Sequence, residues 1–367
     1  MTPAIKTDIG IDIPDNVLAR TDTFADIPSF KLHELELGRV LGSGGFCHVK
    51  EIKDLHLDSN DKDENRSLDD ERIMKTYTEE RDLSEHPSFR KLNPYDGKSQ
   101  PKRKRYAFKQ LKRSLTPEEM SVGVADIWNE VSCLKKMAHP NVIRMRGVVY
   151  DVGGDNSVCI ILDKLNRTLE QEIIRWEQEI GSMDRSILKR SKTKNEMKMI
   201  WKEKINAAYG IACAINYLHA QRIVYRDIKP QNIGFDAQGN VKLFDFGTAK
   251  ELHSKIPGKD AYNMTGLTGS VRYMAPEVFN EKPYNLSVDI YSFGILFWTI
   301  CSMKIPYFRY DMEAIQNDVV NGTSRPSLQR SWKKGWSKLM KNCWDGEPAR
   351  RPTILNVLDF LSNESKM

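Results

Sequence analysis

The chain has 367 residues, of which 40% are hydrophobic and 29% are charged, a composition that excludes collagen-like, mucin-like and fully disordered proteins. Lys and Arg outnumber Asp and Glu by 56 to 50, and a net charge of +6 is too small for the concentrated basic face of a nucleic-acid-binding protein. The longest apolar run, about residues 290–300, is shorter than the ~20 residues that span a bilayer, so no membrane span is expected.

The N-terminus and the cysteines favour an intracellular, cytoplasmic protein. The N-terminal stretch lacks the basic start and apolar core of a secretory signal. The six cysteines are scattered, without a Cys-x-x-Cys pair or matching His spacing, which argues against both a disulfide framework and a zinc site. The basic run Lys102–Arg105 is a candidate nuclear-import patch, although most such runs are simply solvated.

The first third of the chain predicts a leader, a glycine-rich hairpin and an insert. Residues 1–30 carry three prolines and no sustained periodicity. From Leu35, apolar and polar residues alternate on both sides of the cluster Gly42-Ser43-Gly44-Gly45, which predicts two strands joined by a flexible turn. Residues 54–105 hold 13 acidic and 12 basic side chains, so we expect a largely disordered insert that cannot bury enough surface to offset its ordering entropy.

Regular structure is expected to resume after the insert. The pattern predicts a strand at 106–111, a helix around 126–137 and strands at 142–149 and 158–162. The polar and basic stretch 165–201 predicts a helix interrupted by a second insert. A buried helix is expected at 205–220, where Ile205, Ile211, Ile215 and Leu218 recur at helical spacing, and the remainder is mainly helical.

The segment 223–247 carries the strongest chemical signal. It places Asp227, Lys229, Asn232 and Asp245 among short apolar runs, and the turn-forming residues 236–240 predict a hairpin that returns Asp245 towards Asn232. Two carboxylates, an amide oxygen and an ammonium would then meet. Such oxygen ligands suit Mg²⁺, which prefers one or two carboxylates together with substrate phosphates.

Two other features are weak signals by themselves. Glycine clusters serve ordinary turns, but here a strand continues through Val49, as in a flap whose backbone amides face phosphate. Lys109 lies in a predicted strand, where a lysine is more often merely exposed, and Glu130 follows in the predicted helix.

Together these motifs resemble the eukaryotic protein kinase family over roughly residues 31–361. The resemblance implies an α+β, bilobal fold with a small antiparallel-sheet N-lobe (31–162) that has one main helix, and a larger helical C-lobe (163–361). The leader 1–30 and a tail at 362–367 would flank this domain. It also implies transfer of the γ-phosphoryl group of ATP to protein hydroxyls, with Mg²⁺ as the metal.

The resemblance also assigns roles to residues that match the family's motifs. Asp227 would accept the proton of the attacking hydroxyl, Lys229 would face the γ-phosphate, and Lys109 would hold phosphates while paired with Glu130. Asn232 and Asp245 would hold the metal. The residues expected to contact the nucleotide are Leu41, Gly42, Ser43, Gly44, Gly45, Val49, Ala107, Lys109, Asp163, Leu165, Asn232 and Asp245.

Further matches concern anchoring and regulation. Glu277, in Met-Ala-Pro-Glu, would pair with Arg351, and Asp289 would steady the catalytic loop. Arg226 is expected to lie unpaired until a phosphate reaches it at Thr265 or Thr268, added by an upstream activating kinase or by autophosphorylation.

The pairing of DIYSFGILFW with NCWDGEPARRP is similar to the tyrosine-kinase-like group, signalling kinases that mostly phosphorylate serine and threonine. The chain departs from the family pattern at three positions: Cys47 replaces the third glycine, Tyr225 replaces the usual His, and Gly234 stands where a Leu commonly lies beneath the adenine. Because of Gly234 and Cys47, the alternative is a pseudokinase scaffold that binds nucleotide or partner proteins without turnover.

Overall fold

The computed structural model describes residues 27–56, 106–149, 158–184, 190–253, 256–257 and 260–366, without the side chains of 183–193. The chain divides into two compact units. The first comprises residues up to Lys136 together with Arg144–Lys164, and the second comprises Met137–Ile143 together with the chain from Leu165 onward. Most of the predicted leader, the bulk of the charged insert (57–105) and the basic run Lys102–Arg105 lie outside the described residues.

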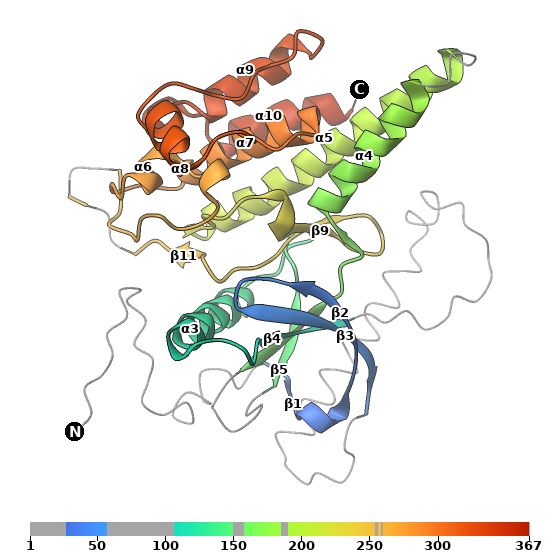
Figure 1. Ribbon diagram of the computed structural model, residues 1–367, viewed down its shortest axis with the longest axis vertical. Helices are drawn as coiled ribbons and strands as arrows, with labels where there is room; N and C mark the ends of the chain where they lie inside the picture. Colours follow the sequence, from blue (N-terminus) through green and yellow to red (C-terminus); the bar gives the residue numbers. More distant parts are fainter. Residues whose placement is uncertain are drawn as a thin grey trace. The chain divides into compact units, whose positions relative to one another are not determined.

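The first unit is built on a six-stranded sheet (Figure 1). Its strand order is β1-β5-β6-β4-β3-β2, and every neighbouring pair is antiparallel except β1 and β5. The strands are β1 (Ser29–Phe30), β2 (Leu35–Ser43), β3 (Cys47–Leu55), β4 (Tyr106–Leu111), β5 (Met145–Val149) and β6 (Cys159–Asp163). A buried cluster that includes Phe30, Ile52, Phe108 and Ile161 forms its core.

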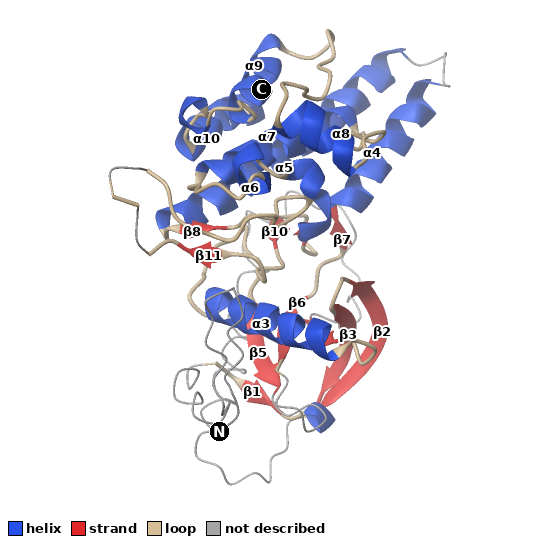
Figure 2. Cartoon of the chain, turned by 60° about the vertical axis from the view of Figure 1, so that its left-hand side comes forward, coloured by secondary structure: helices blue, strands red, loops and turns tan. Residues whose placement is uncertain are grey.

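One helix, α3 (Pro117–Leu134), lies across this sheet (Figure 2). Its start is set locally, because Thr116 and Glu119 form a reciprocal capping box and Pro117 occupies the first turn. Ile127 and Val131 are buried at helical spacing, as the sequence predicts.

The strand predicted at 142–149 is shorter in the structure and begins at Met145. Val142 belongs instead to a turn in which its amide donates to the carbonyl of His139 (3.0 Å), and it forms an isolated bridge with Leu243. The apolar pattern alone could not separate this turn from the strand that follows it.

The second unit is mainly helical. Its helices are α4 (Leu169–Asp184), α5 (Arg190–Ala220), α6 (Pro276–Phe279), α7 (Ser287–Ser302), α8 (Met312–Ala314), α9 (Lys334–Cys343) and α10 (Ile354–Ser365), with a π-helical turn at Ile315–Val320. Every residue of α7 from Val288 to Ser302 is buried, as expected of the central helix of a core. No helix in the described part of the chain is long and apolar enough to cross a membrane.

Helix α5 merges two predicted segments. The sequence predicts an interrupted helix within 165–201 and a further buried helix at 205–220, whereas α5 runs from one segment into the other without a break at residue 201. No proline or glycine occurs in α5 before Gly210, and the helix runs beside α4 (Figure 1).

Two small sheets complete this unit. β7 (Arg167–Thr168), β9 (Ile233–Phe235) and β10 (Val241–Leu243) form one sheet, and β8 (Ile223–Val224) pairs with β11 (Lys250–Glu251) in the other.

Candidate active site

A buried ion pair lies behind the glycine-rich hairpin of the first unit. Lys109, in β4, contacts Glu130 of α3 with 2.5 Å between Nζ and Oε2, and their side chains are 11% and 1% exposed. A buried ammonium needs such a partner, because an uncompensated charge in the interior is strongly destabilising. The strand register sets Lys109 opposite Val49, next to the glycine cluster. Lys109 is therefore a buried functional candidate, and not the exposed strand lysine that its local sequence favours.

Packing does not require the residues of the glycine cluster to lack side chains. A Cβ atom on Gly42 or Gly45 would meet nothing within 4 Å, and one on Gly44 would approach only the Cys47 carbonyl, at 3.9 Å. These glycines leave the backbone open on that side, which is the arrangement a phosphate needs in order to reach backbone amides.

In the second unit, Asp227 is held by three donors. Its Oδ1 accepts a hydrogen bond from the Ser270 amide (2.9 Å), and its Oδ2 accepts from Lys229 Nζ (2.7 Å) and Asn232 Nδ2 (2.8 Å). The Asp227 residue is only 8% exposed. A carboxylate constrained in this way presents its oxygens in one fixed direction.

The hairpin predicted after Asn232 is confirmed. β9 and β10 pair with Ile233 opposite Leu243, and the Phe244 amide donates to the Asn232 carbonyl (3.0 Å), which sets Asp245 one residue beyond that contact. Asp236 closes the turn through its backbone and its side chain.

The donor set at this hairpin fits Mg²⁺. The side chain of Asn232 donates both of its hydrogen bonds to described residues from Nδ2, so its Oδ1 keeps its lone pairs there, and Asp245 supplies a carboxylate. Among the described residues, no three His, Cys, Asp or Glu side chains gather in a metal-binding cluster. A cation here would therefore depend on substrate phosphates for its remaining ligands, which is how Mg²⁺ binds in nucleotide-dependent enzymes.

Comparison with known proteins identifies the family. The model of the family described as "Protein kinase domain" matches residues 93–360. The chain belongs to the protein kinase family. Its glycine-rich hairpin precedes the matched range and is connected to it by the register of β3 with β4.

Several curated kinases are similar to this one. They include mitogen-activated protein kinase kinase kinase 13-B of Xenopus laevis (30% identical over 232 residues, 63% of this chain and 21% of the relative) and mitogen-activated protein kinase kinase kinase 13 of Homo sapiens (30% over 246 residues, 66% and 23%). A putative serine/threonine-protein kinase/receptor of Acanthamoeba polyphaga mimivirus is 30% identical over 236 residues, 64% of this chain and 12% of the relative. The kinase thus matches no more than about a quarter of the length of these relatives, and as its motifs predict it resembles the tyrosine-kinase-like group.

The catalytic loop of the kinase is tied to α7 through Asp289, which is fully buried. Asp289 accepts hydrogen bonds from the backbone amides of Tyr225 and Arg226, each at 2.9 Å. This supports the loop-steadying role that the family resemblance implies. Sequence reasoning missed the third partner, His219, whose Nε2 lies 2.9 Å from Asp289 Oδ2 across 70 residues of chain.

Arg226 is not unpaired, contrary to the sequence-based expectation. It donates to the Thr248 carbonyl (2.6 Å), to Thr265 Oγ1 (3.0 Å) and to the Tyr284 hydroxyl (3.2 Å). Folding brings these oxygens to the guanidinium from segments up to 58 residues away, which local sequence could not reveal.

The remaining expected anchors are present. Arg351 donates two hydrogen bonds to the Glu277 carboxylate, at 2.6 and 2.8 Å, in a buried bidentate pair. Tyr225 is buried and packs edge-on against Phe246, with ring centroids 5.2 Å apart, and its hydroxyl donates to the Phe244 carbonyl.

The expected nucleotide contacts are divided between the two units. Leu41, Val49, Ala107 and Asp163 lie on strands of the first unit, and Leu165 opens the second, just before β7. Asp163 is already bonded, because Arg146 Nε donates to its Oδ1 (2.6 Å).

Proposed function

We propose that this kinase is catalytically active and transfers the γ-phosphoryl group of ATP to serine or threonine hydroxyls of protein substrates. The observation that carries the proposal is the constrained Asp227 carboxylate. Its Oδ2 accepts hydrogen bonds from Lys229 and Asn232, whereas Oδ1 has one donor among the described residues, the Ser270 amide. Oδ1 therefore retains a lone pair with which to orient a substrate hydroxyl and accept its proton as the oxygen attacks phosphorus.

The other site residues act by charge and position. Lys109, kept extended by Glu130, binds phosphate oxygens of the nucleotide. Lys229, whose side chain is 23% exposed, faces the transferred phosphoryl group while its bond to Asp227 fixes the ammonium. Asn232 and Asp245 would hold Mg²⁺, which would neutralise phosphate charge when bound.

Serine and threonine are favoured as acceptors by two observations. Lys229, two residues after Asp227, follows the pattern of serine/threonine kinases, and a relative with 30% identity carries serine/threonine-protein kinase in its name. By the same likeness, protein substrates within a kinase cascade and control by an upstream kinase are expected.

The hydrogen bonds and ion pair of these side chains argue against the pseudokinase alternative. A scaffold without turnover has no need of a catalytic carboxylate with three aligned donors, or of a buried lysine matched to a glutamate. Neither Gly234 nor Cys47 removes any of these groups.

A phosphoryl-transfer assay tests the proposal. The full chain is incubated with γ-labelled ATP, Mg²⁺ and a mixed protein substrate, and the labelled products are resolved by phosphoamino-acid analysis. We expect phosphoserine and phosphothreonine. Asp227→Asn, Lys109→Met and Asp245→Asn should each lower the rate about a hundredfold or more, because each removes a proton acceptor or an electrostatic contact of the transition state.

The exposed Lys202→Met is the matched control and should keep the full rate. A folded chain that binds nucleotide but transfers no phosphate would establish the pseudokinase. Phosphotyrosine as the main product would reject the acceptor assignment alone.

A further inference from the structure

The outward face of α9 is a row of lysines. Lys334, Lys338 and Lys341 follow one another at spacings of four and three, so they share one face of the helix, and all three are exposed. The opposite face is buried through Trp336 and Met340. The helix contains no acidic residue. One side of α9 therefore packs into the core, and the charged side chains on the other side are all positive.

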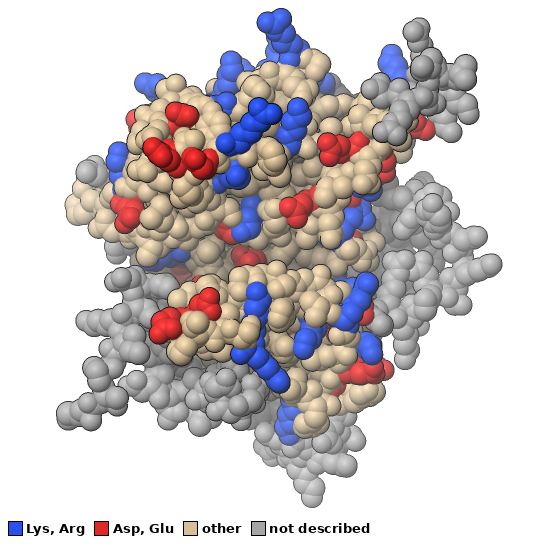
Figure 3. All heavy atoms as spheres, in the orientation of Figure 1, with Lys and Arg blue, Asp and Glu red and all other residues tan. Residues whose placement is uncertain are grey.

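These cations are not held in ion pairs by the neighbours that the structure describes. Among the described residues, Lys334, Lys338, Lys341 and the exposed Arg330 ahead of the helix form no ion pair, whereas Lys333 is engaged by Glu364 at 2.7 Å. We call Arg330, Lys334, Lys338 and Lys341 the basic row. Figure 3 shows basic side chains, with acidic side chains beside them, over the upper part of the molecule, where α9 lies in Figure 1.

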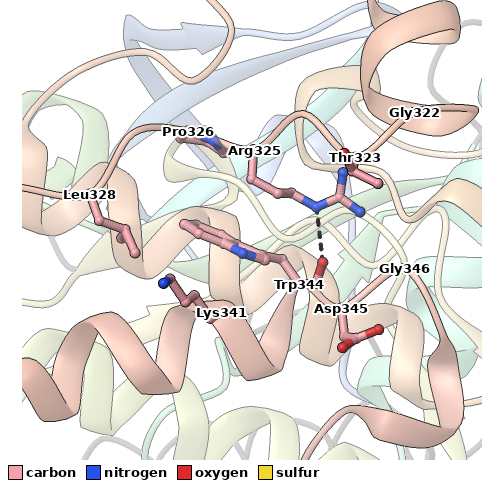
Figure 4. Close-up of a pocket in the computed structure, with 9 residues that line it drawn as sticks. All are labelled: Gly322, Thr323, Arg325, Pro326, Leu328, Lys341, Trp344, Asp345 and Gly346. Atoms are coloured by element: carbon pink, nitrogen blue, oxygen red, sulfur yellow. Dashed lines mark hydrogen bonds between the residues drawn. The ribbon is translucent and has the colours of Figure 1, made fainter.

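The basic row ends in a groove of about 540 Å³. Lys341 belongs to both features, because the groove is lined by Gly322, Thr323, Arg325, Pro326, Leu328, Lys341, Trp344, Asp345 and Gly346 (Figure 4). Pro326, Leu328 and Trp344 give it apolar walls. Its size is that of a site for one large side chain or a short stretch of peptide.

A fixed guanidinium lies in this groove. Arg325 donates from Nε to the Trp344 carbonyl (2.9 Å) and from Nη1 to the carbonyls of Val319 (3.0 Å) and Ser324 (2.7 Å). Its Nη2 has no hydrogen-bond partner within the described part of the chain. Arg325 thus adds a positioned donor to the apolar walls, at the end of the basic row.

We propose that the basic row and the groove together bind an acidic segment of a partner protein, with one apolar side chain of that segment seated in the groove. From Lys334 to Lys341 the helix advances ~10 Å, a distance covered by about three or four extended residues. Carboxylates at alternate positions of an extended chain point the same way and match cations on one helix face.

An acidic protein segment fits this surface better than an acidic membrane does. A helix that lies on a bilayer inserts an exposed apolar face, but the large apolar residues of α9 are buried, and the described residues from 313 to 354 include no exposed large hydrophobic side chain. The apolar contact is available only inside the groove, which admits a side chain and not a lipid surface.

Fluorescence anisotropy of a labelled peptide tests the proposal on the full chain. The probe is a peptide of about ten residues in which glutamates flank a central leucine. Lys334→Glu with Lys338→Glu should weaken its binding about tenfold or more, and the affinity of the unmodified chain should fall as salt is added. The matched control is Lys198→Glu with Lys202→Glu, which reverses the charge of two exposed lysines with the same spacing on α5. This variant should bind the peptide as the unmodified chain does.

The groove is tested separately. Thr323→Trp fills the groove from its exposed rim and should lower the affinity for the leucine peptide to that for a peptide with glycine at the centre. Unchanged phosphoryl transfer to a substrate without acidic residues would show that the variants are folded. The proposal would be overturned if both double lysine variants lost peptide affinity equally, if the unmodified chain did not bind the peptide, or if it bound only to vesicles of acidic lipid.

Discussion

The side chain of Leu165 lies where a side chain at position 234 would have to go. A Cβ built on Gly234 would be 2.5 Å from Leu165 Cδ1 and 3.3 Å from both Leu165 Cβ and the Arg167 carbonyl oxygen. The absent side chain of Gly234 is thus replaced by one from the segment that leads into β7, so the apolar surface over β9 is kept. The sequence shows that Gly234 lacks the side chain that commonly lies beneath the adenine, but it could not show that Leu165 fills the space.

This relationship predicts coupling between the two positions. Gly234→Ala should destabilise the kinase by about 1–2 kcal/mol, because Leu165 must leave its position to admit the new methyl group. In a Leu165→Ala background the same change should cost little. Urea unfolding of the four proteins measures the coupling, and additive effects would show that Leu165 moves aside freely.

Stability should depend on pH through Lys204. Its Nζ is fully buried without a hydrogen-bond partner among the described residues, and it lies 4.6 and 5.7 Å from the ring centroids of Trp201 and Trp176. Burial lowers the pKa of Lys204 to about 8, and burial raises the pKa of the neighbouring Cys301 thiol, which therefore stays neutral.

The direction of this pH dependence follows from proton binding. Because the folded-state pKa is below the unfolded value of ~10.4, the unfolded chain binds more protons between about pH 8 and pH 10, and the free energy of unfolding should rise with pH across that window, by up to about 3 kcal/mol. Lys204→Met, which keeps the packing without the amine, should abolish this rise. Urea unfolding at several pH values measures it, and identical pH profiles for the two proteins would contradict the prediction.

Phosphorylation of Thr265 should raise activity. Thr265 Oγ1 already accepts a hydrogen bond from Arg226 (3.0 Å), whereas the Thr268 hydroxyl donates to the Gly266 carbonyl (3.1 Å), so Thr265 is the better placed of the two candidates. Burial, and after it the charge of Arg226, lower the pKa of Lys250, so two cations lie close together here. A phosphate on Thr265 would bring negative charge to these two cations.

Turnover should therefore drop after phosphatase treatment, and Thr265→Ala and Arg226→Ala should each remove the response to phosphorylation, with Thr268→Ala as the matched control. Undiminished turnover of phosphatase-treated protein would rule out the switch.

Most of the charged insert should be dispensable for folding. Ile52 pairs with Tyr106 in the β3–β4 ladder, so the two ends of the insert are neighbours whatever lies between them. His56 still belongs to the first unit, because its backbone amide donates a hydrogen bond to the Glu34 carbonyl (2.8 Å). Replacing residues 58–102 by a short flexible linker should retain cooperative unfolding and basal phosphoryl transfer, because each halving of a loop changes its closure cost by only ~0.6 kcal/mol. Insoluble or non-cooperative protein would show that the insert contributes to the first unit.

The sequence by itself determined the features that depend on neighbours along the chain. The β9–β10 hairpin follows from turn chemistry at Asp236–Asn240, and the start of α3 follows from the capping box at Thr116. The motif from Asp227 to Asp245, together with the glycine cluster, Lys109 and Glu130, indicated the family. These signals lie within a few residues of the structures that they predict, so no long-range contact is needed to interpret them.

Only the tertiary structure decided the contacts that join distant segments. Asp289 meets His219 across 70 residues, Leu165 fills the space at Gly234, and Lys204 is buried against Trp176 of a different helix. The spacing of residues along the sequence does not indicate such contacts, because they form when helices and strands pack their buried faces together. The side chains at each interface then fill the remaining space. For the same reason, the basic row could be recognised as a surface only after the opposite face of α9 was found buried.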